Sequence, residues 1–475
     1  MQNISLADFL EYRFLSKLQL SPDGSKAAFV VSRQNKQENN YAADIYLAHC
    51  AAHSIKQLTH TGKEHDFVWD GADTLLFPSC RCKEDEAPRF YQKTVFYRLS
   101  LSGGEAYRAF EVPYDVKEIC PCGDGVHYAM AVRIDHTRPD PRTHTMEECE
   151  DAEDYILLEE MPFATNGEGY TSRVRMTLAL YNAETDETKL LTPPMFMLGA
   201  FRWAGKQLVY TGHSYTTVKA KTKGMYAYSL ATGETRTLVE DGALAIYHIG
   251  EEEGTVLFTA SDLKQYGSAS GQDFYKLSLA GGGCEKLLAH ELVPGTSPIT
   301  DSTYGSGNAF VCAQGAAYYI VLDRFQSHIR SIDAAGVQQE ILGFDGGIQM
   351  LDMRGGATVF VGMQKNSLQE LYVLAGGKAV CISAFNSPLL SARALQPVHY
   401  TPFQNRAGQQ IDGWVLMPSG YEKGKKYPGI LEIHGGPKAA YGEVFFHEMQ
   451  VLAGRGYFVF FCNPRGSAAR GVQFA

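Results

Sequence analysis

A strand–turn–strand pattern recurs through most of this sequence and constrains the fold more than any other feature. Each copy has an apolar strand, a turn, an alternating strand that carries aromatic residues, a glycine-containing turn and a short exit strand. One position of the alternating strand marks the seven copies: Tyr46, Tyr97, Tyr181, Tyr228, Tyr275, Arg330 and Tyr372. These positions are 51, 84, 47, 47, 55 and 42 residues apart. Except for the second interval, the spacing is close to the ~40–50 residues typical of propeller blades.

The physics of such a repeat supports a propeller. Each copy is a small antiparallel sheet with two apolar faces, so it excludes water only by stacking on its neighbours. Ser21–Gly24, which reads Ser-Pro-Asp-Gly, places proline where φ is preset and glycine where the chain reverses. We predict a helix over residues 1–20, with a capping-box-like start at Ser5 and Asp8, and a seven-bladed β-propeller over residues 21–390. An irregular all-β sandwich is the alternative, and it does not explain the regular spacing.

The 84-residue interval contains an insertion with a strongly acidic segment, Glu147–Glu160. Eight of its fourteen residues are acidic and none is basic. Such runs of like charge are usually solvated surface loops, which is one interpretation. The alternative is an acidic mouth that attracts positively charged groups such as free amino termini. Glu159 and Glu160 are then the best-placed substrate-binding pair, because apolar residues flank them.

Charge and cysteine usage exclude several classes of function. The formal net charge of −10 leaves no basic patch to neutralise phosphates, so we expect no nucleic-acid partner. The ten cysteines include two Cys-x-Cys pairs, Cys80/Cys82 and Cys120/Cys122. Zinc sites usually have two or more residues between paired cysteines. We therefore interpret these four as strand residues with alternating faces and expect no metal site.

The beginning of the chain does not resemble a targeting segment. Asp8, Glu11 and Arg13 interrupt the apolar run that a secretory signal peptide needs. No run approaches 18 apolar residues, so we expect no membrane-spanning segment and no membrane partner. Without a signal peptide, disulfides are not expected either, and the sequence predicts a protein of the reducing cytoplasm.

The repeat ends at about residue 390, and residues 391–475 follow a different pattern. Two antiparallel strands are followed by an apolar strand buried on both faces, a helix with one apolar stripe, and a second buried strand. The expected strands are 399–403, 411–418, 429–434 and 457–463, and the expected helix is 443–455. The last three elements form a parallel βαβ unit, so a domain of a different class begins here. The motif described next identifies residues 391–475 as the start of an α/β-hydrolase catalytic domain.

The turn after the strand at 429–434 carries the residues His434, Gly435, Gly436 and Pro437. In α/β-hydrolases the corresponding loop donates a backbone N–H to the oxyanion of an acyl-transfer intermediate through an HGG-type motif. Glycine suits this role, because a side chain would block the approach of the substrate carbonyl. One such donor is worth roughly 3–4 kcal/mol of transition-state stabilisation. A tight turn without a catalytic role is the alternative, and the strand and helix around the motif favour the oxyanion loop.

A β-propeller followed by this motif and by Asn-Pro-Arg-Gly-Ser at 463–467 resembles the prolyl oligopeptidase family of serine peptidases. Its acylaminoacyl-peptidase-like and dipeptidyl-peptidase-like bacterial members are the most similar branch. The resemblance implies that Gly436 donates the oxyanion N–H and that Gly435 supplies room. It implies that His434 stands where some relatives use a tyrosine hydroxyl. It also places the loop of Arg465 near the active-site wall, where Arg465 contacts substrate or forms a structural ion pair.

The same resemblance implies a Ser-His-Asp triad whose serine lies within G-x-S-x-G. No serine of this chain has glycine at both flanking second positions, and the segments around Ser214 and Ser306 fail this test. We therefore expect the nucleophile to lie beyond Ala475, the chain to be the N-terminal two-thirds of an enzyme, and the chain alone to be inactive. His447 falls near the apolar face of the predicted helix, so we interpret it as structural rather than as the triad base.

The resemblance thus predicts a serine peptidase that hydrolyses short peptides in an aminoacyl-, acylaminoacyl- or dipeptidyl-peptidase-like manner, without a cofactor. One alternative is a non-catalytic β-propeller interaction module with a vestigial tail. Another is an esterase that uses the same oxyanion loop on a non-peptide ester. The sequence leaves open the residue preference at the scissile bond, exopeptidase or endopeptidase action, and homo-oligomer formation.

Overall fold

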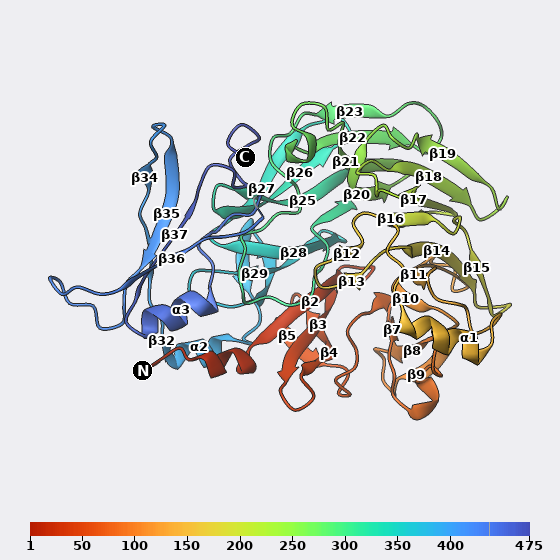
Figure 1. The fold of residues 1–475 in the computed structure, drawn as a ribbon, viewed down its shortest axis with the longest axis horizontal. Helices are drawn as coiled ribbons and strands as arrows, with labels where there is room; N and C mark the ends of the chain where they lie inside the picture. The colour runs from red at the N-terminus through yellow and green to blue at the C-terminus, as the bar shows by residue number, and fades with distance from the viewer. Residues whose placement is uncertain (437) are drawn as a thin grey trace. The chain divides into compact units, whose positions relative to one another are not determined.

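The computed structural model describes residues 1–436 and 438–475, and most of their elements are β-strands (Figure 1). Pro437, the last residue of the His-Gly-Gly-Pro motif, lies outside the described residues. The chain divides into two compact units. The first comprises Met1–His65, Leu263–Phe274 and Lys286–Ala475, and the second comprises Asp66–Asp262 and Tyr275–Glu285.

Three four-stranded antiparallel sheets belong to the first unit. One sheet consists of β2 (Arg13–Leu20), β3 (Lys26–Asn35), β4 (Asn40–His49) and β5 (Ser54–Gln57). The next consists of β24 (Phe310–Ala313), β25 (Ala316–Asp323), β26 (Gln326–Asp333) and β27 (Gln338–Phe344). The third consists of β28 (Gly347–Arg354), β29 (Ala357–Met363), β30 (Glu370–Ala375) and β31 (Lys378–Cys381).

The second unit contains three further sheets of the same kind. The first consists of β6 (Val68–Trp69), β7 (Thr74–Pro78), β8 (Thr94–Ser100) and β9 (Tyr107–Val112). The second consists of β10 (Asp115–Pro121), β11 (His127–Asp135), β14 (Val174–Asn182) and β15 (Glu187–Leu190). The third consists of β16 (Phe196–Ala204), β17 (Gln207–Ser214), β18 (Gly224–Ser229) and β19 (Thr235–Val239). A seventh sheet has residues in both units: β20 (Ala245–Glu252), β21 (Thr255–Ser261), β22 (Asp273–Ser278) and β23 (Glu285–Leu288).

The predicted repeat corresponds to these sheets one to one within the described residues. Every anchor of the repeat lies on the third strand of a sheet, from Tyr46 on β4 to Tyr372 on β30. The seven repeat units predicted from the sequence thus correspond to seven four-stranded sheets. Their closure into one seven-bladed ring stays a prediction.

Each sheet buries an apolar face against another, as the stacking argument requires. In the first unit, Leu15, Phe29 and Val31 of the β2–β5 sheet form one core with Val359 and Leu371 of the β28–β31 sheet. In the second unit, equivalent cores join the sheets in chain order. Each Å² of apolar surface removed from water stabilises the folded state by about 25 cal/mol. These cores are therefore the main favourable contribution to the stability of the fold.

The predicted N-terminal helix over residues 1–20 is wrong beyond its first turns. A short 3₁₀ helix, η1, spans Leu6–Glu11, and Arg13–Leu20 is the strand β2. The Asp8 carboxylate accepts hydrogen bonds from the N–H and hydroxyl of Ser5, so this part of the helix start is present. The apolar residues of this segment have helical spacing, but the segment pairs with β3 as a strand. Lys17, at φ 57°, forms a β-bulge that interrupts the alternation of buried and exposed residues expected of a strand.

The insertion between β11 and β14 has little regular structure. It contains helix α1 (Met146–Asp151), the 3₁₀ helix η3 (Ala152–Asp154) and a hairpin of β12 (Ala164–Thr165) and β13 (Gly169–Tyr170). Half of the acidic segment is therefore helical rather than a plain loop.

The interpretation of the Cys-x-Cys pairs as strand residues is wrong for three of the four cysteines. Cys80 and Cys82 lie in the loop between β7 and the 3₁₀ helix η2 (Lys83–Asp85), and Cys122 follows the end of β10. The Asp85 carboxylate accepts the N–H groups of Arg81 and Cys82, and this side-chain turn ends the strand.

A mixed sheet follows the repeat, after helix α2 (Ser387–Ser391) (Figure 1). Its strands are β33 (Val398–Tyr400), β34 (Phe403–Gln404), β35 (Gln410–Leu416), β36 (Gly429–Glu432) and β37 (Phe458–Asn463). β36 and β37 are parallel and are joined through helix α3 (His447–Gly454), which confirms the predicted βαβ unit. The predicted change of pattern near residue 390 lies between β31 and β33.

The prediction that the strand after Pro428 is buried on both faces is wrong. β36 is shorter than predicted, and its only pairing partner in the described part of the chain is β37. The side chains of Leu431 and Ile433 are 57% and 75% exposed. An edge strand has one free row of backbone groups, so its apolar side chains lack the neighbours that bury those of a central strand.

A loop of the first unit caps helix α3. The two carboxylate oxygens of Asp301 accept the backbone N–H groups of His447 and Glu448, each at 2.8 Å. These are two of the four N–H groups that a helix leaves without an internal partner. The helix therefore begins at His447, four residues later than predicted, where an acceptor is available.

We expect Asp301→Ala to lower the free energy of unfolding by about 1 kcal/mol, the usual cost of losing a capping side chain. Asp301→Asn keeps one acceptor oxygen and should lose less. Chemical denaturation of the three proteins measures both differences. Equal stability of all three would show that water replaces the cap without cost.

Candidate active site

The predicted oxyanion loop leaves the sheet at the end of β36, and His434 fixes its start. The His434 Nε2 atom lies 2.9 Å from Ser467 Oγ, and Nδ1 lies 2.9 Å from the carbonyl oxygen of Gly435. The imidazole also packs edge-on against Tyr441. Ser467 is 1% exposed, so its hydroxyl serves as a buried partner of the histidine rather than as an accessible nucleophile.

Gly436 adopts a backbone conformation that requires glycine. Its φ is +126°, and a Cβ atom there would lie 2.8 Å from the backbone nitrogens of Lys438 and Ala439. Gly435 and Gly436 are both exposed. Within residues 1–436 and 438–475, no hydrogen-bond acceptor pairs with the N–H of either glycine. Donation by these amides to the oxyanion of a substrate stays a prediction.

The loop after β37 packs against the predicted oxyanion loop. The Asn463 side chain accepts the N–H of Tyr441 and donates to its carbonyl, at 2.8 and 2.9 Å. The Ala468 N–H donates to the carbonyl of Ala439. Together with the His434–Ser467 contact, these bonds fix the two loops to one another.

Arg465 is exposed at the start of the same loop. No side-chain hydrogen bond or ion pair joins it to a residue of the described ranges. The sequence leaves two roles open for Arg465, a structural ion pair and contact with the substrate. Arg465 forms no ion pair with the described residues. A role in substrate contact stays a prediction.

The predicted oxyanion loop also contacts residues 263–274 and 286–325 of its own unit. The Lys438 ammonium donates to the carbonyl of Ala269 in the 3₁₀ helix η4 (Gly267–Ala269), and burial lowers the pKa of this lysine. The Ile299 N–H donates to the carbonyl of Ala440 at 3.0 Å. A Cβ at Gly442 would lie 2.6 Å from the Phe325 carbonyl oxygen. Helix η4, the loop before β24 and the turn after β25 thus contact the predicted oxyanion loop.

Glu160 lies in a buried ion pair of the second unit. Its carboxylate binds the Arg175 guanidinium through both oxygens, and the two side chains are 1% and 0% exposed. It also accepts the backbone N–H of Arg173 at 2.7 Å. Burial would raise the pKa of Glu160, but the bonds from Arg175 and Arg173 outweigh it and lower the pKa.

Glu159 is the more accessible residue of the predicted amine-binding pair. Its side chain is 42% exposed and forms an ion pair with Arg173 at 2.6 Å. Both carboxylates therefore have guanidinium partners in this structure. Binding of a substrate amino group by these two residues stays a prediction.

His447 has the structural environment that the sequence predicts for it. It is 6% exposed, and its Nδ1 atom lies 2.8 Å from the hydroxyl of Tyr12, with Phe9 packed against the ring. Burial lowers the pKa of His447. The contact between Ser467 and His434 is not predictable from the sequence, because no local pattern pairs two residues 33 positions apart.

Comparisons with known proteins bear on the fold of the chain. No protein-family model matches the chain. An uncharacterized peptidase, YuxL, of Bacillus subtilis is 26% identical over 96% of this chain and 70% of its own length. A solved acylaminoacyl peptidase in complex with Z-Gly-Gly-Phe-chloromethyl ketone has a TM-score of 0.80 at 18% identity, over 99% of this chain and 68% of that one.

A third comparison concerns the repeat alone. The β-propeller domain of the Trilobed protease from Pyrococcus furiosus has a TM-score of 0.54 at 12% identity, over 80% of this chain and 98% of that domain. These proteins are peptidases or parts of them. Over the residues that it covers, the chain thus has the fold of the acylaminoacyl peptidases, a β-propeller joined to an α/β-hydrolase domain.

Proposed function

We propose that this chain is part of a serine peptidase that hydrolyses short peptides. The observation that carries the proposal is the pair of exposed amides at Gly435 and Gly436, which have no acceptor among residues 1–436 and 438–475. The contact between His434 and Ser467 holds the start of their loop at the end of β36. Preorganised N–H donors that await a developing negative charge are the usual main contribution to acyl-transfer catalysis. The likeness to YuxL and to the acylaminoacyl peptidase supports the choice of peptides as substrates.

In the proposed reaction, a serine hydroxyl attacks the scissile carbonyl carbon and its proton passes to a histidine. The Gly436 N–H and the amide after the serine hold the oxyanion. The C–N bond then breaks, the histidine protonates the leaving amine, and water hydrolyses the acyl-enzyme by the same steps in reverse order. The serine, the histidine and the aspartate lie outside this sequence, C-terminal to Ala475, so the chain alone is inactive.

The remaining parts of the proposal concern substrate access. The seven sheets form a seven-bladed propeller that covers the hydrolase face and admits only small or unfolded peptides. Arg465 contacts the substrate beside the oxyanion loop. Glu159 attracts the amino terminus of the peptide, because its carboxylate is exposed while that of Glu160 is buried.

The test is hydrolysis by the protein encoded by the complete reading frame. We expect it to cleave aminoacyl-, acylaminoacyl- or dipeptidyl-anilides and to lose this activity when the serine of a downstream G-x-S-x-G is changed to alanine. The chain of 475 residues should cleave none of them. Turnover of nitrophenyl esters without any anilide would identify an esterase instead. A complete reading frame without G-x-S-x-G would leave a non-catalytic propeller.

A further inference from the structure

A cavity of about 970 Å³ lies within the second unit, next to the insertion that follows β11. Residues 90–92 and 113–114 and most residues of 133–144 line it. Cys149 of α1 and Glu153 of η3 complete the lining together with Leu190. Pockets of ~300–1,000 Å³ commonly bind small organic molecules, so the size alone permits a ligand.

Most charged groups on the cavity wall already have partners. The Arg142 guanidinium binds the Asp140 carboxylate through two nitrogens, at 2.7 to 3.0 Å. Glu153 forms an ion pair with Arg89 at 2.8 Å. His144 contacts the carbonyl oxygen of Asp140 and the hydroxyl of Thr143. Asp135 accepts the N–H and hydroxyl of Thr137.

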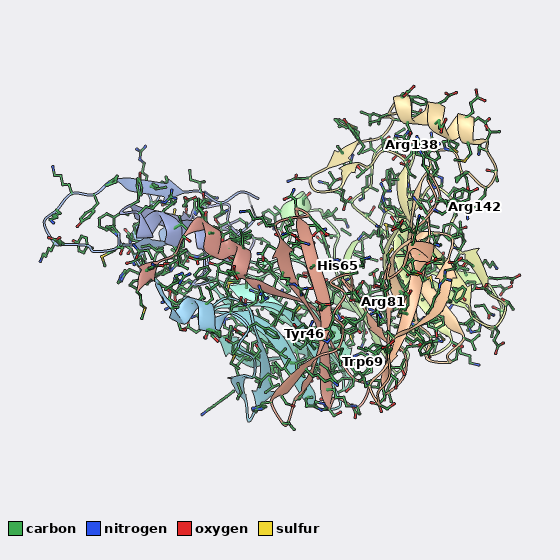
Figure 2. All side chains as sticks on the ribbon, turned by 90° about the horizontal axis from the view of Figure 1, so that it is seen from below. Tyr46, His65, Trp69, Arg81, Arg138 and Arg142 are labelled. Atoms are coloured by element: carbon green, nitrogen blue, oxygen red, sulfur yellow. The ribbon has the colours of Figure 1, made fainter. Side chains whose placement is uncertain are left out.

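Two arginines and one histidine of the lining have polar atoms without a partner among the described residues. The guanidinium groups of Arg133 and Arg138 have no hydrogen bond or ion pair with any residue of the described ranges. The Nε2 atom of His136 is buried and has no partner there. Arg138 and Arg142 are labelled in Figure 2, where both lie near the helix of the insertion. The wall therefore offers two unpaired cations in a chain whose net charge is −10.

Aromatic side chains also line the cavity. Phe90, Tyr91 and Tyr114 belong to the lining. The Arg142 guanidinium stacks over the Tyr114 ring at 5.0 Å, and the Tyr91 hydroxyl donates to the carbonyl of Pro141 at 3.2 Å. These contacts hold the rings in fixed positions, as in pockets that bind a flat or apolar group.

We propose that this cavity binds a small organic carboxylate with an aromatic or apolar body. Arg133 and Arg138 bind the carboxylate, because the planar guanidinium donates two parallel hydrogen bonds to such a group. Phe90, Tyr91 and Tyr114 contact the body, and His136 Nε2 bonds to a polar atom of the ligand. The proposal does not depend on the peptidase reaction, since every residue that it uses lies in the second unit.

Isothermal titration calorimetry of the full chain with N-acetyl-L-phenylalanine tests the proposal. We expect saturable binding that weakens with added salt, and binding at least tenfold weaker for the matching amide, which lacks the charge. Arg133→Gln and Arg138→Gln should each weaken binding about tenfold or more, the usual effect of losing a hydrogen bond to a charged group. Arg202→Gln is the matched control, because Arg202 lies in the same unit, pairs with Glu118 and does not line the cavity.

Other outcomes would overturn the proposal. The acid fails to bind, or the acid and the amide bind equally well. Arg202→Gln weakens binding as much as Arg133→Gln and Arg138→Gln do, or inorganic phosphate at an equal concentration displaces the acid. Arg138 is exposed, so Arg138→Gln keeps the test valid even where Arg133→Gln prevents folding.

Discussion

Glu160→Gln is expected to lower the free energy of unfolding by about 3–5 kcal/mol, the cost of leaving one member of a buried ion pair without its partner. The substitution keeps the size of the side chain but leaves the buried Arg175 guanidinium without a counter-charge. Arg175 keeps its bonds to the carbonyls of Met195 and Tyr215 and its stacking on the Tyr215 ring at 3.8 Å. Neutral acceptors do not replace a carboxylate, so the loss remains large. Chemical denaturation measures it.

The neighbouring pair provides a matched control. Glu159→Gln removes the same charge one residue away, but Glu159 and Arg173 are 42% and 39% exposed, so we expect a loss of about 0–1 kcal/mol. Similar losses for the two variants would contradict the assignment of a structural role to Glu160. The two variants also separate effects on stability from effects on substrate binding. Only Glu159→Gln should change the preference for free amino termini in a protein that stays stably folded.

The same ion pair predicts the pH dependence of stability. The folded-state pKa of Glu160 lies below its ordinary value of about 4.3. The stabilisation that the ionised carboxylate provides is therefore fully present when the pH is above the ordinary pKa. The contribution is lost as the pH falls through the lower folded-state pKa. Wild type should therefore lose more stability than Glu160→Gln on acidification below about pH 4.

Under the proposed mechanism, Gly436→Ala is expected to reduce kcat of the protein encoded by the complete reading frame by about 10²–10³, the usual effect of losing one oxyanion donor. A methyl group at Gly436 would lie 2.8 Å from two backbone nitrogens, and φ of +126° is unfavourable for alanine. The turn must therefore shift and redirect the N–H. Because the amide acts in the transition state, KM should change less than kcat. Steady-state hydrolysis of a peptidyl-anilide measures both constants.

Gly435→Ala is the control for this experiment. A methyl group there meets no described atom within 4 Å, and Gly435 is not among the glycines with positive φ. We expect this variant to keep most of kcat and to raise KM, because the methyl group narrows the space for the substrate. An unchanged kcat in Gly436→Ala, with wild-type melting behaviour, would remove Gly436 from the oxyanion site.

Much of the fold could be predicted from the sequence because its signals are local. Tyr46, Tyr228 and the other repeat anchors identify the third strand of every sheet, since alternation and turn residues are encoded within each copy. The βαβ unit was found for the same reason. The strand nature of 13–20 was missed because the bulge at Lys17 gives its apolar residues a helical spacing.

The candidate site was less predictable, because it depends on contacts between distant residues. The His-Gly-Gly motif indicates an oxyanion loop, yet the buried Ser467 that holds His434 comes from another loop. The acidic run likewise does not show that Glu160 meets Arg175, fifteen residues later, inside the second unit. Charge patterns describe which groups are present, and only packing decides which of them are neutralised.

The cap on helix α3 has a consequence for the order in which the protein assembles during synthesis. Asp301 precedes the helix that it caps by 146 residues, and the β24–β27 sheet ends 103 residues before His447. At ~5–20 residues per second, that sheet leaves the ribosome roughly 5–20 s before the helix begins to emerge. The acceptor for the first helical turn is thus in place early, so the nascent helix meets a prepared surface instead of nucleating by itself.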